Sequence, residues 1–317
     1  MTCIRCNHSN AQRFGTFGKR KIQRYRCVSC RATFCEPHTR VGTHYIAPEK
    51  AAKVISLMME GASLRSITRL MDIDLKTVLS LLETAGQQCR RVFDAYVRRM
   101  RCEFVQADEI HTTVGCHQRR LRPDSPSEWG DAYTWIAIDS TTKMIIAYHV
   151  GRRDADSAWE FIRELRARTE GVFQLTTDGL RAYVDAVDAH FNIGIHFAQL
   201  IKLYSSPDIT GPDWYGATSR VTGTIPNVRC GRPDPRYVST SHVERLNLSL
   251  RVHLRRFVRR TNAHSRKLDN LKFAVHIFMA WFCLCRVHQT LRCTPAMEAG
   301  LTNHIWTMEE LICHGSL

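Results

Sequence analysis

The sequence has no apolar segment long enough to cross a bilayer. Its longest apolar run, FAVHIFMAWFCLC at 273–285, contains a histidine and falls short of the roughly 20 residues that a membrane helix needs. The N-terminus, MTCIRCNHSN, also lacks the apolar core of a secretory signal. We therefore expect a cytoplasmic protein that has no membrane partner.

Acidic residues are missing from the first 31 positions, which contain eight Lys and Arg. Residues 1–101 contain 19 Lys and Arg against seven Asp and Glu, so most of the net charge of +15 is N-terminal. Such a block usually binds nucleic acid, because each cation that neutralises a phosphate releases a counterion, although charge can also serve solubility alone. The length of 317 residues and the hydrophobic content of 44% indicate a folded protein of two or three domains.

Disulfides are not expected, because the thirteen cysteines occur without an export signal and a cytosol keeps thiols reduced. Four cysteines form two CxxC pairs, CIRC at 3–6 and CVSC at 27–30, and each pair can place two thiolates on one tetrahedral ion. The basic stretch between the pairs predicts a hairpin of two strands. We predict a zinc ribbon at residues 1–40, in which Zn²⁺ is held by Cys3, Cys6, Cys27 and Cys30.

Residues 45–85 have the apolar spacing of three helices. The first ends at Gly61, a short second helix opens at Ser63, and Asp74 can cap the third. The expected buried stripe of the third helix is Leu75, Val78, Leu79 and Leu82. This order is typical of a helix-turn-helix DNA-binding domain, although any small bundle of three helices can share it.

The last helix of a helix-turn-helix enters the major groove by its N-terminal residues. We therefore expect the DNA contacts of this domain at Arg65, Lys76, Thr77 and Ser80. The next segment, GQQCRRVFDAYVRRMR at 86–101, predicts a basic helical linker that follows the phosphate backbone.

Residues 102–317 predict an α/β domain that contains a mixed sheet covered by helices. The expected strands and crossover helix are CEFVQADEI (102–110), DAYTWIAIDS (131–140), KMIIAYHV (143–150), the helix at 154–169 and VFQLTTDG (172–179). Asp108 and Asp178 fall near strand ends, where carboxylates can converge.

Other acids compete for such a site. They are Glu109, Asp139, Asp154 and Asp156. Because neighbouring side chains of a strand point to opposite faces, we expect that Asp108 and Glu109 cannot both face one metal without a bulge. Asp139 can initiate a turn and Asp154 can cap a helix, but these patterns leave the choice of acids open.

Several blocks of the sequence together resemble a transposase of the insertion-sequence-1 family. They are VQADEI, WIAIDSTTKMIIAYHVGRR, TTDGLRAY, AQLIKLY, STSHVERLNLSLR, RRTNAHSRKLDN and HQTLRCTPAMEAGL, and the match covers nearly the whole chain. The resemblance implies a multidomain protein in which a zinc ribbon and a helix-turn-helix precede a ribonuclease-H-like catalytic domain. The chain departs from the family pattern at His111, usually aromatic, and at Asn7 and Arg31, where zinc knuckles often have glycine.

The resemblance also implies an acidic triad, which falls on Asp108, Asp178 and Glu244. Such a triad holds Mg²⁺ or Mn²⁺, because phosphodiester attack builds charge on the entering and leaving oxygens. The implied partners are the double-stranded DNA of the element ends and of the target. The family further implies a prokaryotic, nucleoid-associated protein and a homo-oligomer when two DNA ends are paired.

The stretch around Glu244 carries four arginines and one acid, STSHVERLNLSLRVHLRRF at 239–257. On a helix beginning near Ser241, Glu244 shares a face with Asn247 and Arg251, so Asn247 can orient the acid and Arg251 can hold the scissile strand. The expected DNA contacts of this stretch are Asn247, Arg251, Arg255, Arg256, Arg259 and Arg260. The alternative is a solvated helix in which Glu244 forms a salt bridge with Arg245 or Arg251.

Three other functions are compatible with parts of the sequence. A tyrosine recombinase is excluded, because its nucleophile would lie downstream and no tyrosine follows Tyr237. A non-catalytic DNA-binding repressor and a metal-dependent nuclease remain as alternatives. The unbroken run through all three acids favours an enzyme that cleaves and joins DNA.

Overall fold

The computed structural model describes residues 1–18, 22–35, 41, 46–192, 194–205, 221–258 and 261–314. The chain divides into two compact units, Met1–Pro48 and Glu49–Leu317. Among the described residues, no helix combines the length and the apolar character that a membrane crossing requires.

The first unit is a three-stranded antiparallel sheet. Its strands lie in the order β1 (Ala11–Phe17), β2 (Ile22–Cys27) and β3 (Thr33–Cys35), and β1 and β2 are the predicted hairpin strands. The buried cluster consists of Cys3, Cys27 and Phe34. A unit this small buries too little apolar surface for stability, and chains below about 40 residues usually need a metal or disulfides.

The second unit begins with the three helices that the apolar spacing predicted: α1 (Pro48–Met59), α2 (Leu64–Met71) and α3 (Leu75–Tyr96). Both predicted N-caps are confirmed, because Ser63 accepts from the backbone of Ser66 at 3.1 Å and Asp74 accepts from the backbone of Lys76 at 2.7 Å. The predicted stripe is wrong at Leu75, which is 40% exposed.

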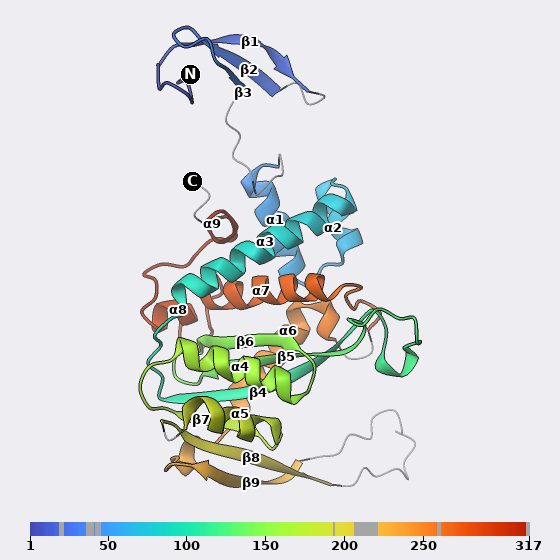
Figure 1. The fold of residues 1–317 in the computed structure, drawn as a ribbon, viewed down its shortest axis with the longest axis vertical. Coiled ribbons are helices and arrows are strands. Elements are labelled where there is room, and N and C mark those ends of the chain that lie inside the picture. Colours follow the sequence, from blue (N-terminus) through green and yellow to red (C-terminus); the bar gives the residue numbers. More distant parts are fainter. Residues whose placement is uncertain are drawn as a thin grey trace. The chain divides into compact units, whose positions relative to one another are not determined.

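The stretch predicted as a basic helical linker, 86–101, is helical as far as Tyr96. Residues 86–96 continue the helix, and Gly86, Cys89 and Phe93 are buried within it. A Cβ atom on Gly86 would lie 2.5 Å from the Cβ of Phe273, so α3 and α7 (Leu268–Leu284) approach closely at this point. Figure 1 shows the two helices side by side. One face of this stretch is therefore packed against the rest of the unit.

The centre of this unit is a six-stranded mixed sheet in the order β6-β5-β4-β7-β8-β9. The strands are β4 (Phe104–Val114), β5 (Gly130–Asp139), β6 (Ile145–Gly151), β7 (Gln174–Asp178), β8 (His196–Tyr204) and β9 (Val221–Cys230). The first three are antiparallel neighbours, and β7 then joins β4 in parallel after the crossover helix α4 (Ala155–Arg168). The predicted mixed sheet is confirmed, whereas β8 and β9 were not predicted.

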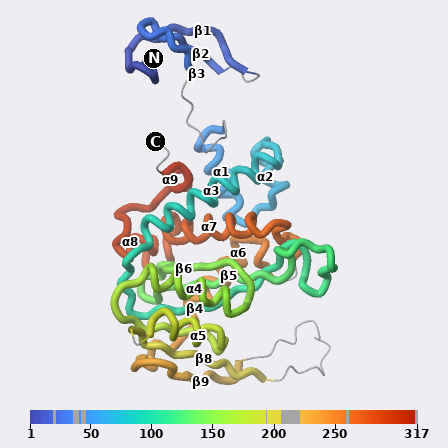
Figure 2. Tube along the Cα trace, in the orientation of Figure 1, coloured from blue at the N-terminus to red at the C-terminus, as the bar shows by residue number. Residues whose placement is uncertain are grey.

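Helices cover both faces of the sheet (Figure 1, Figure 2). Trp135 on β5 contacts Phe161 of α4 and Tyr183 of α5 (Ala182–Phe191) on one face. Tyr148 on β6 instead points to the face of α3 and α7, where it contacts Phe93 and hydrogen-bonds His276. The remaining helices are α6 (Ser241–His253), which packs on β4 and β5, α8 (Pro295–Glu298) and α9 (Met308–Cys313).

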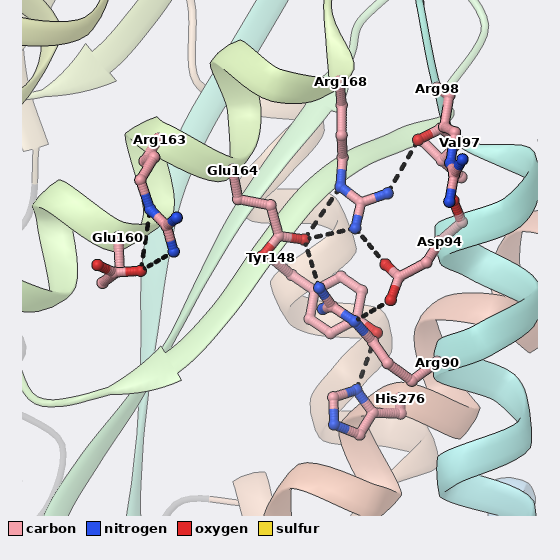
Figure 3. Close-up of polar contacts among 10 residues, drawn as sticks. All are labelled: Arg90, Asp94, Val97, Arg98, Tyr148, Glu160, Arg163, Glu164, Arg168 and His276. Carbon is pink, nitrogen blue, oxygen red and sulfur yellow. Dashed lines mark hydrogen bonds and ion pairs between the residues drawn. The ribbon is translucent and has the colours of Figure 1, made fainter.

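Four charged side chains connect α3 to α4 (Figure 3). Arg90 of α3 pairs with Glu164 of α4 at 3.0 Å, and Arg168 of α4 pairs with both Glu164 and Asp94. Arg168 also donates to the Val97 carbonyl at 2.9 Å. Arg168 is 9% exposed and Glu164 is 19% exposed, so these two charges depend on their partners for compensation, and the network fixes α3 on the α/β core.

Candidate active site

The structure brings three carboxyl groups together beside the end of β7. Asp108 and Glu109 lie within β4, and Asp178 is the last residue of β7. One oxygen from each of the three lies within 4.8 Å of the others. Oxygen atoms at this spacing are suitable ligands for a hard divalent cation.

The expectation that Asp108 and Glu109 cannot face one metal without a bulge is wrong. The pairing of β4 with β5 runs through both residues without a register shift. The parallel pairing of β4 with β7, however, runs only over Phe104–Gln106. Beyond it the β7 side of β4 is open, so two side chains that start on opposite faces can both reach past this edge toward Asp178.

The crowding of acids raises their affinity for protons. Burial and, after it, the nearby Glu109 and Asp178 carboxylates raise the pKa of Asp108 to about 7, against the opposing effect of the Lys202 ammonium. The pKa of Glu109 is also raised, first by burial and then by Asp178, against the opposing effect of Arg153. A bound cation would relieve both the burial penalty and the mutual repulsion.

Glu109 already has two partners. Arg153 Nε pairs with its Oε1 at 2.6 Å, and the Tyr183 hydroxyl donates to its Oε2 at 3.1 Å. Its side chain is only 3% exposed. Arg153 also lies 3.7 Å from Asp178 Oδ2, so this one cation partly offsets two acids.

Glu244, the third acid of the expected triad, lies outside this cluster of three carboxylates. It occupies the first turn of α6 and is 44% exposed. Its Oε1 pairs with the Lys202 ammonium of β8 and accepts from the Thr240 hydroxyl at 2.5 Å. Lys202 also acts electrostatically on Asp108, so this lysine lies between the third acid and the first.

Asn247 contacts a different acid from the one expected. Its Nδ2 donates to Asp108 Oδ2 at 2.8 Å, so the expectation that it orients Glu244 is wrong. Asn247 is buried, and within the described residues its Oδ1 has no hydrogen-bond partner. Because Asn247 lies one helical turn after Glu244, this bond places the start of α6 beside β4.

The expected DNA contacts differ in their exposure. Arg65, Lys76 and Arg255 are exposed, whereas Thr77, Ser80 and Arg251 are half-buried. Arg256 is half-buried as well: desolvation lowers the pKa of its guanidinium to about 10, and it donates to Ser265 and to the Asn270 carbonyl. Arg259 and Arg260 lie outside the described residues.

The four expected zinc ligands also lie together. The Cys3 and Cys30 sulfurs are 3.6 Å apart, as are those of Cys6 and Cys27, and all four lie within 4.8 Å of one another. Tetrahedral zinc with bonds of about 2.3 Å requires sulfurs about 3.8 Å apart, so the cluster fits the ion. Asn7 and Arg31 both adopt φ of 56°, so each knuckle makes a left-handed turn without glycine.

Three side chains of the site were missed by the sequence analysis, namely Arg153, Tyr183 and Lys202. Arg153 and Lys202 lie inside the quoted blocks WIAIDSTTKMIIAYHVGRR and AQLIKLY, and Tyr183 ends TTDGLRAY. Their presence in blocks that resemble the family was the one indication in the sequence that they could belong to the site. Their partners are distant in sequence, so spacing alone gave them no role.

Residues 129–203, which include β5, β6, β7 and most of β8, match the family model for the DDE domain of IS240-type transposases. The matched segment includes Asp178, Arg153 and Lys202. Comparison with curated proteins finds no match.

Solved transposase structures align weakly with this chain. A piggyBac transposase synaptic complex with hairpin DNA aligns at a TM-score of 0.41 and 9% identity, over 87% of this chain and 72% of that one. A Mos1 transposase paired-end complex with the left transposon end has a TM-score of 0.18 at 12% identity, over 50% and 60% of the two chains. The Mos1 strand transfer complex has a TM-score of 0.19 at 12% identity, over 77% and 81%.

Proposed function

We propose that this chain, an insertion-sequence transposase of the DDE type, cleaves DNA at the ends of its element and joins the freed strand to target DNA. The observation that carries the proposal is the convergence of Asp108 and Asp178 beside a segment that matches a DDE domain. The strand order, with β4 at the centre and helices on both faces, supports a ribonuclease-H-like core.

Asp108, Asp178 and Glu244 are the residues that we assign to the metal centre, with Mg²⁺ or Mn²⁺ as the ion. When bound, the metal supplies Lewis-acid stabilisation of the entering and leaving phosphate oxygens. The protein's part is to hold the carboxylates in place. Asn247 does so for Asp108, and the backbone of Leu180 donates to Asp178 Oδ1 at 3.0 Å.

Glu244 is preferred to Glu109 as the third ligand because its carboxylate is more available. Both oxygens of Glu109 are engaged, and the side chain is almost fully buried. In the described part of the chain, both polar contacts of Glu244 are made by Oε1. Exchange of the Lys202 ammonium for a divalent cation would free this oxygen too, and Glu244 lies one turn from the residue that binds Asp108.

The N-terminal elements are assigned to DNA binding. The four clustered cysteines support a Zn²⁺ ion, and the basic hairpin strands of the ribbon suit phosphate contacts. In the helix-turn-helix reading, Lys76, Thr77 and Ser80 of α3 and Arg65 of α2 lie on the DNA. Pairing two element ends requires a homo-oligomer.

A strand-transfer assay tests the proposal. Purified protein with Mg²⁺ and a plasmid carrying the gene and its flanking DNA should release and rejoin DNA ends. Asp108→Ala, Asp178→Ala and Glu244→Gln should each reduce both steps to background while DNA binding persists. Binding without cleavage by the parent protein would favour a repressor, and cleavage without joining would favour a nuclease.

Glu109→Gln is the matched comparison for Glu244→Gln. Glu109 is assigned to positioning through Arg153, and loss of such support typically costs 10- to 100-fold rather than all activity. An inactive Glu109→Gln variant beside an active Glu244→Gln variant would show that Glu109 is the third ligand.

A further inference from the structure

Two segments that are distant in the sequence meet at one cavity. The segment after α7 contributes Arg286 and His288, and the first turn of α6 contributes His242 and Arg245. Lys143, from the turn between β5 and β6, completes the basic lining. The cavity has a volume of about 360 Å³.

The lining has the chemistry of an anion site. Three of its side chains are cations, Lys143, Arg245 and Arg286, and two more are histidines, and within the described part of the chain none of its lining residues is acidic. Ser249, Gln289 and Thr290 add hydroxyl and amide donors at the same cavity. Clusters of cations with neutral donors recognise phosphate oxygens, because each contact can be a charge-assisted hydrogen bond.

The positive charges are not balanced by the nearest acids. Asp139 lies near Lys143 and His242, but it is buried and its Oδ2 accepts from the Thr142 backbone at 2.9 Å and from its hydroxyl. Glu60, which follows the last residue of α1, acts on Arg286, although Arg245 opposes it. Neither acid lines the cavity.

The lowered pKa of His288 is consistent with an excess of positive charge at the cavity. Burial lowers the pKa of its imidazole, and Lys143, Arg286 and Arg245 lower it further. Its Nδ1 is buried and has no hydrogen-bond partner among the described residues. An anion in the cavity would reduce the repulsion among these groups.

We propose that this cavity binds a backbone phosphate of the DNA strand that passes the active site. Arg245 lines the cavity and directly follows Glu244, so a strand held here runs beside the first turn of α6. The inference rests on the proposed function and adds a phosphate site to it. The site places a strand next to the third carboxylate without contacting the reacting atoms.

The test is the salt dependence of DNA binding by the full chain. All variants carry Asp108→Ala, so none of them cleaves DNA. The binding measurement therefore does not depend on whether the parent protein is catalytically active. Fluorescence anisotropy with a labelled random-sequence duplex gives the affinity at several KCl concentrations. Lys143→Ala and Arg286→Ala should each weaken DNA binding several-fold. Each should also make the plot of log association constant against log salt concentration less steep, by about 0.9 in slope.

Two controls separate the cavity from general charge loss. Lys143→Arg keeps the cation and should retain the parent slope. Arg163→Ala removes a cation of α4 that is 63% exposed and paired with Glu160, and it should also leave the slope unchanged. Arg286 packs on Trp281 and Phe282, so the Lys143 variants provide the readout that is independent of this packing.

Unchanged affinity and slope in Lys143→Ala and Arg286→Ala proteins that retain the parent melting temperature would overturn the proposal. Calorimetric titration with inorganic phosphate tests whether the cavity instead binds a free phosphate ion. If phosphate binds the parent but not Lys143→Ala, and the DNA slope is unaffected by the variant, the cavity takes a free phosphate and the DNA assignment fails.

Discussion

At the level of single residues, the site depends on how its acids are compensated. Asp108, Glu109 and Asp178 lie close together, and Arg153 offsets only part of their charge. Glu244 has its own cation, Lys202. A metal ion that displaces the Lys202 ammonium from Glu244 must bind the carboxylate more strongly than the ammonium does. A divalent cation can do so, because it has twice the charge and several ligand positions.

The raised pKa of Asp108 predicts a stability change with pH. Its pKa rises from 3.8 to about 7 on folding, so the folded protein holds this proton more tightly than the unfolded chain does. Stability present below pH 4 is therefore lost as the pH rises toward 7, at up to about 1.4 kcal/mol for each pKa unit. Without divalent metal, Asp108→Asn should melt at a higher temperature than the parent at pH 8.

Melting curves between pH 4 and pH 8 provide the measurement. Asp185→Asn, at an exposed acid of α5, is the matched control and should change little. Added Mg²⁺ should raise the melting temperature of the parent and of the control but not that of Asp108→Asn. A less stable Asp108→Asn protein at pH 8 would contradict the electrostatic explanation.

At the level of elements, α3 has two roles along its length. Its first turns belong to the three-helix group that we assign to DNA binding, and its last turns are buried against α7 and joined to α4. A continuous helix is stiff, because each backbone hydrogen bond spans a full turn. Helix α3 therefore fixes the direction of its N-terminal residues with respect to the sheet.

The charge network in Figure 3 predicts unequal effects for two arginines of α4. Arg168 is 9% exposed, and its removal leaves Asp94 and Glu164 with Arg90 as their remaining ion-pair partner and the Val97 carbonyl without its donor. Breaking a fully buried pair typically costs 3–5 kcal/mol, and the cost here should be smaller because Arg90 remains and Asp94 is 37% exposed. Arg168→Ala should therefore lower the urea midpoint.

Arg163→Ala is the control on the same helix. Arg163 and its partner Glu160 are 63% and 46% exposed, and a surface pair contributes about 0–1 kcal/mol. Equal urea midpoints for the two variants would show that the network does not stabilise the fold.

Across the whole molecule, the two units obtain stability from different sources. The larger unit has an extended apolar core on both faces of its sheet. The first unit has a core cluster of Cys3, Cys27 and Phe34, two of which are assigned to the metal. Its folding should therefore be coupled to zinc binding, because the site forms only in the folded unit and the free energy of zinc binding then stabilises the fold.

Zinc removal should affect one unit and spare the other. The purified protein should contain about one zinc per chain, and a strong chelator should abolish the ordered signals of the ribbon while the main unfolding transition keeps its midpoint. Cys27→Ser should lose the zinc. Cys35→Ser, at a neighbouring cysteine outside the cluster, should retain it, and equal zinc content in both variants would argue against the assigned ligands.

The features that the sequence predicted correctly depend on short spacing. The CxxC pairs, the caps at Ser63 and Asp74, and the strands around Asp108 and Asp178 all follow from residues a few positions apart. Such local patterns constrain backbone geometry directly, so they can be recognised without knowing what packs against them.

The features that were missed depend on contacts between distant segments. Glu109 joins Asp108 because β4 extends past its pairing with β7, and Lys202 meets Glu244 because β8 and α6 fold together. Arg256 meets Ser265 and the Asn270 carbonyl for the same reason. Periodicity assigns a side chain to a face of its own element, but the neighbouring elements determine what that face contacts, and packing alone sets those neighbours.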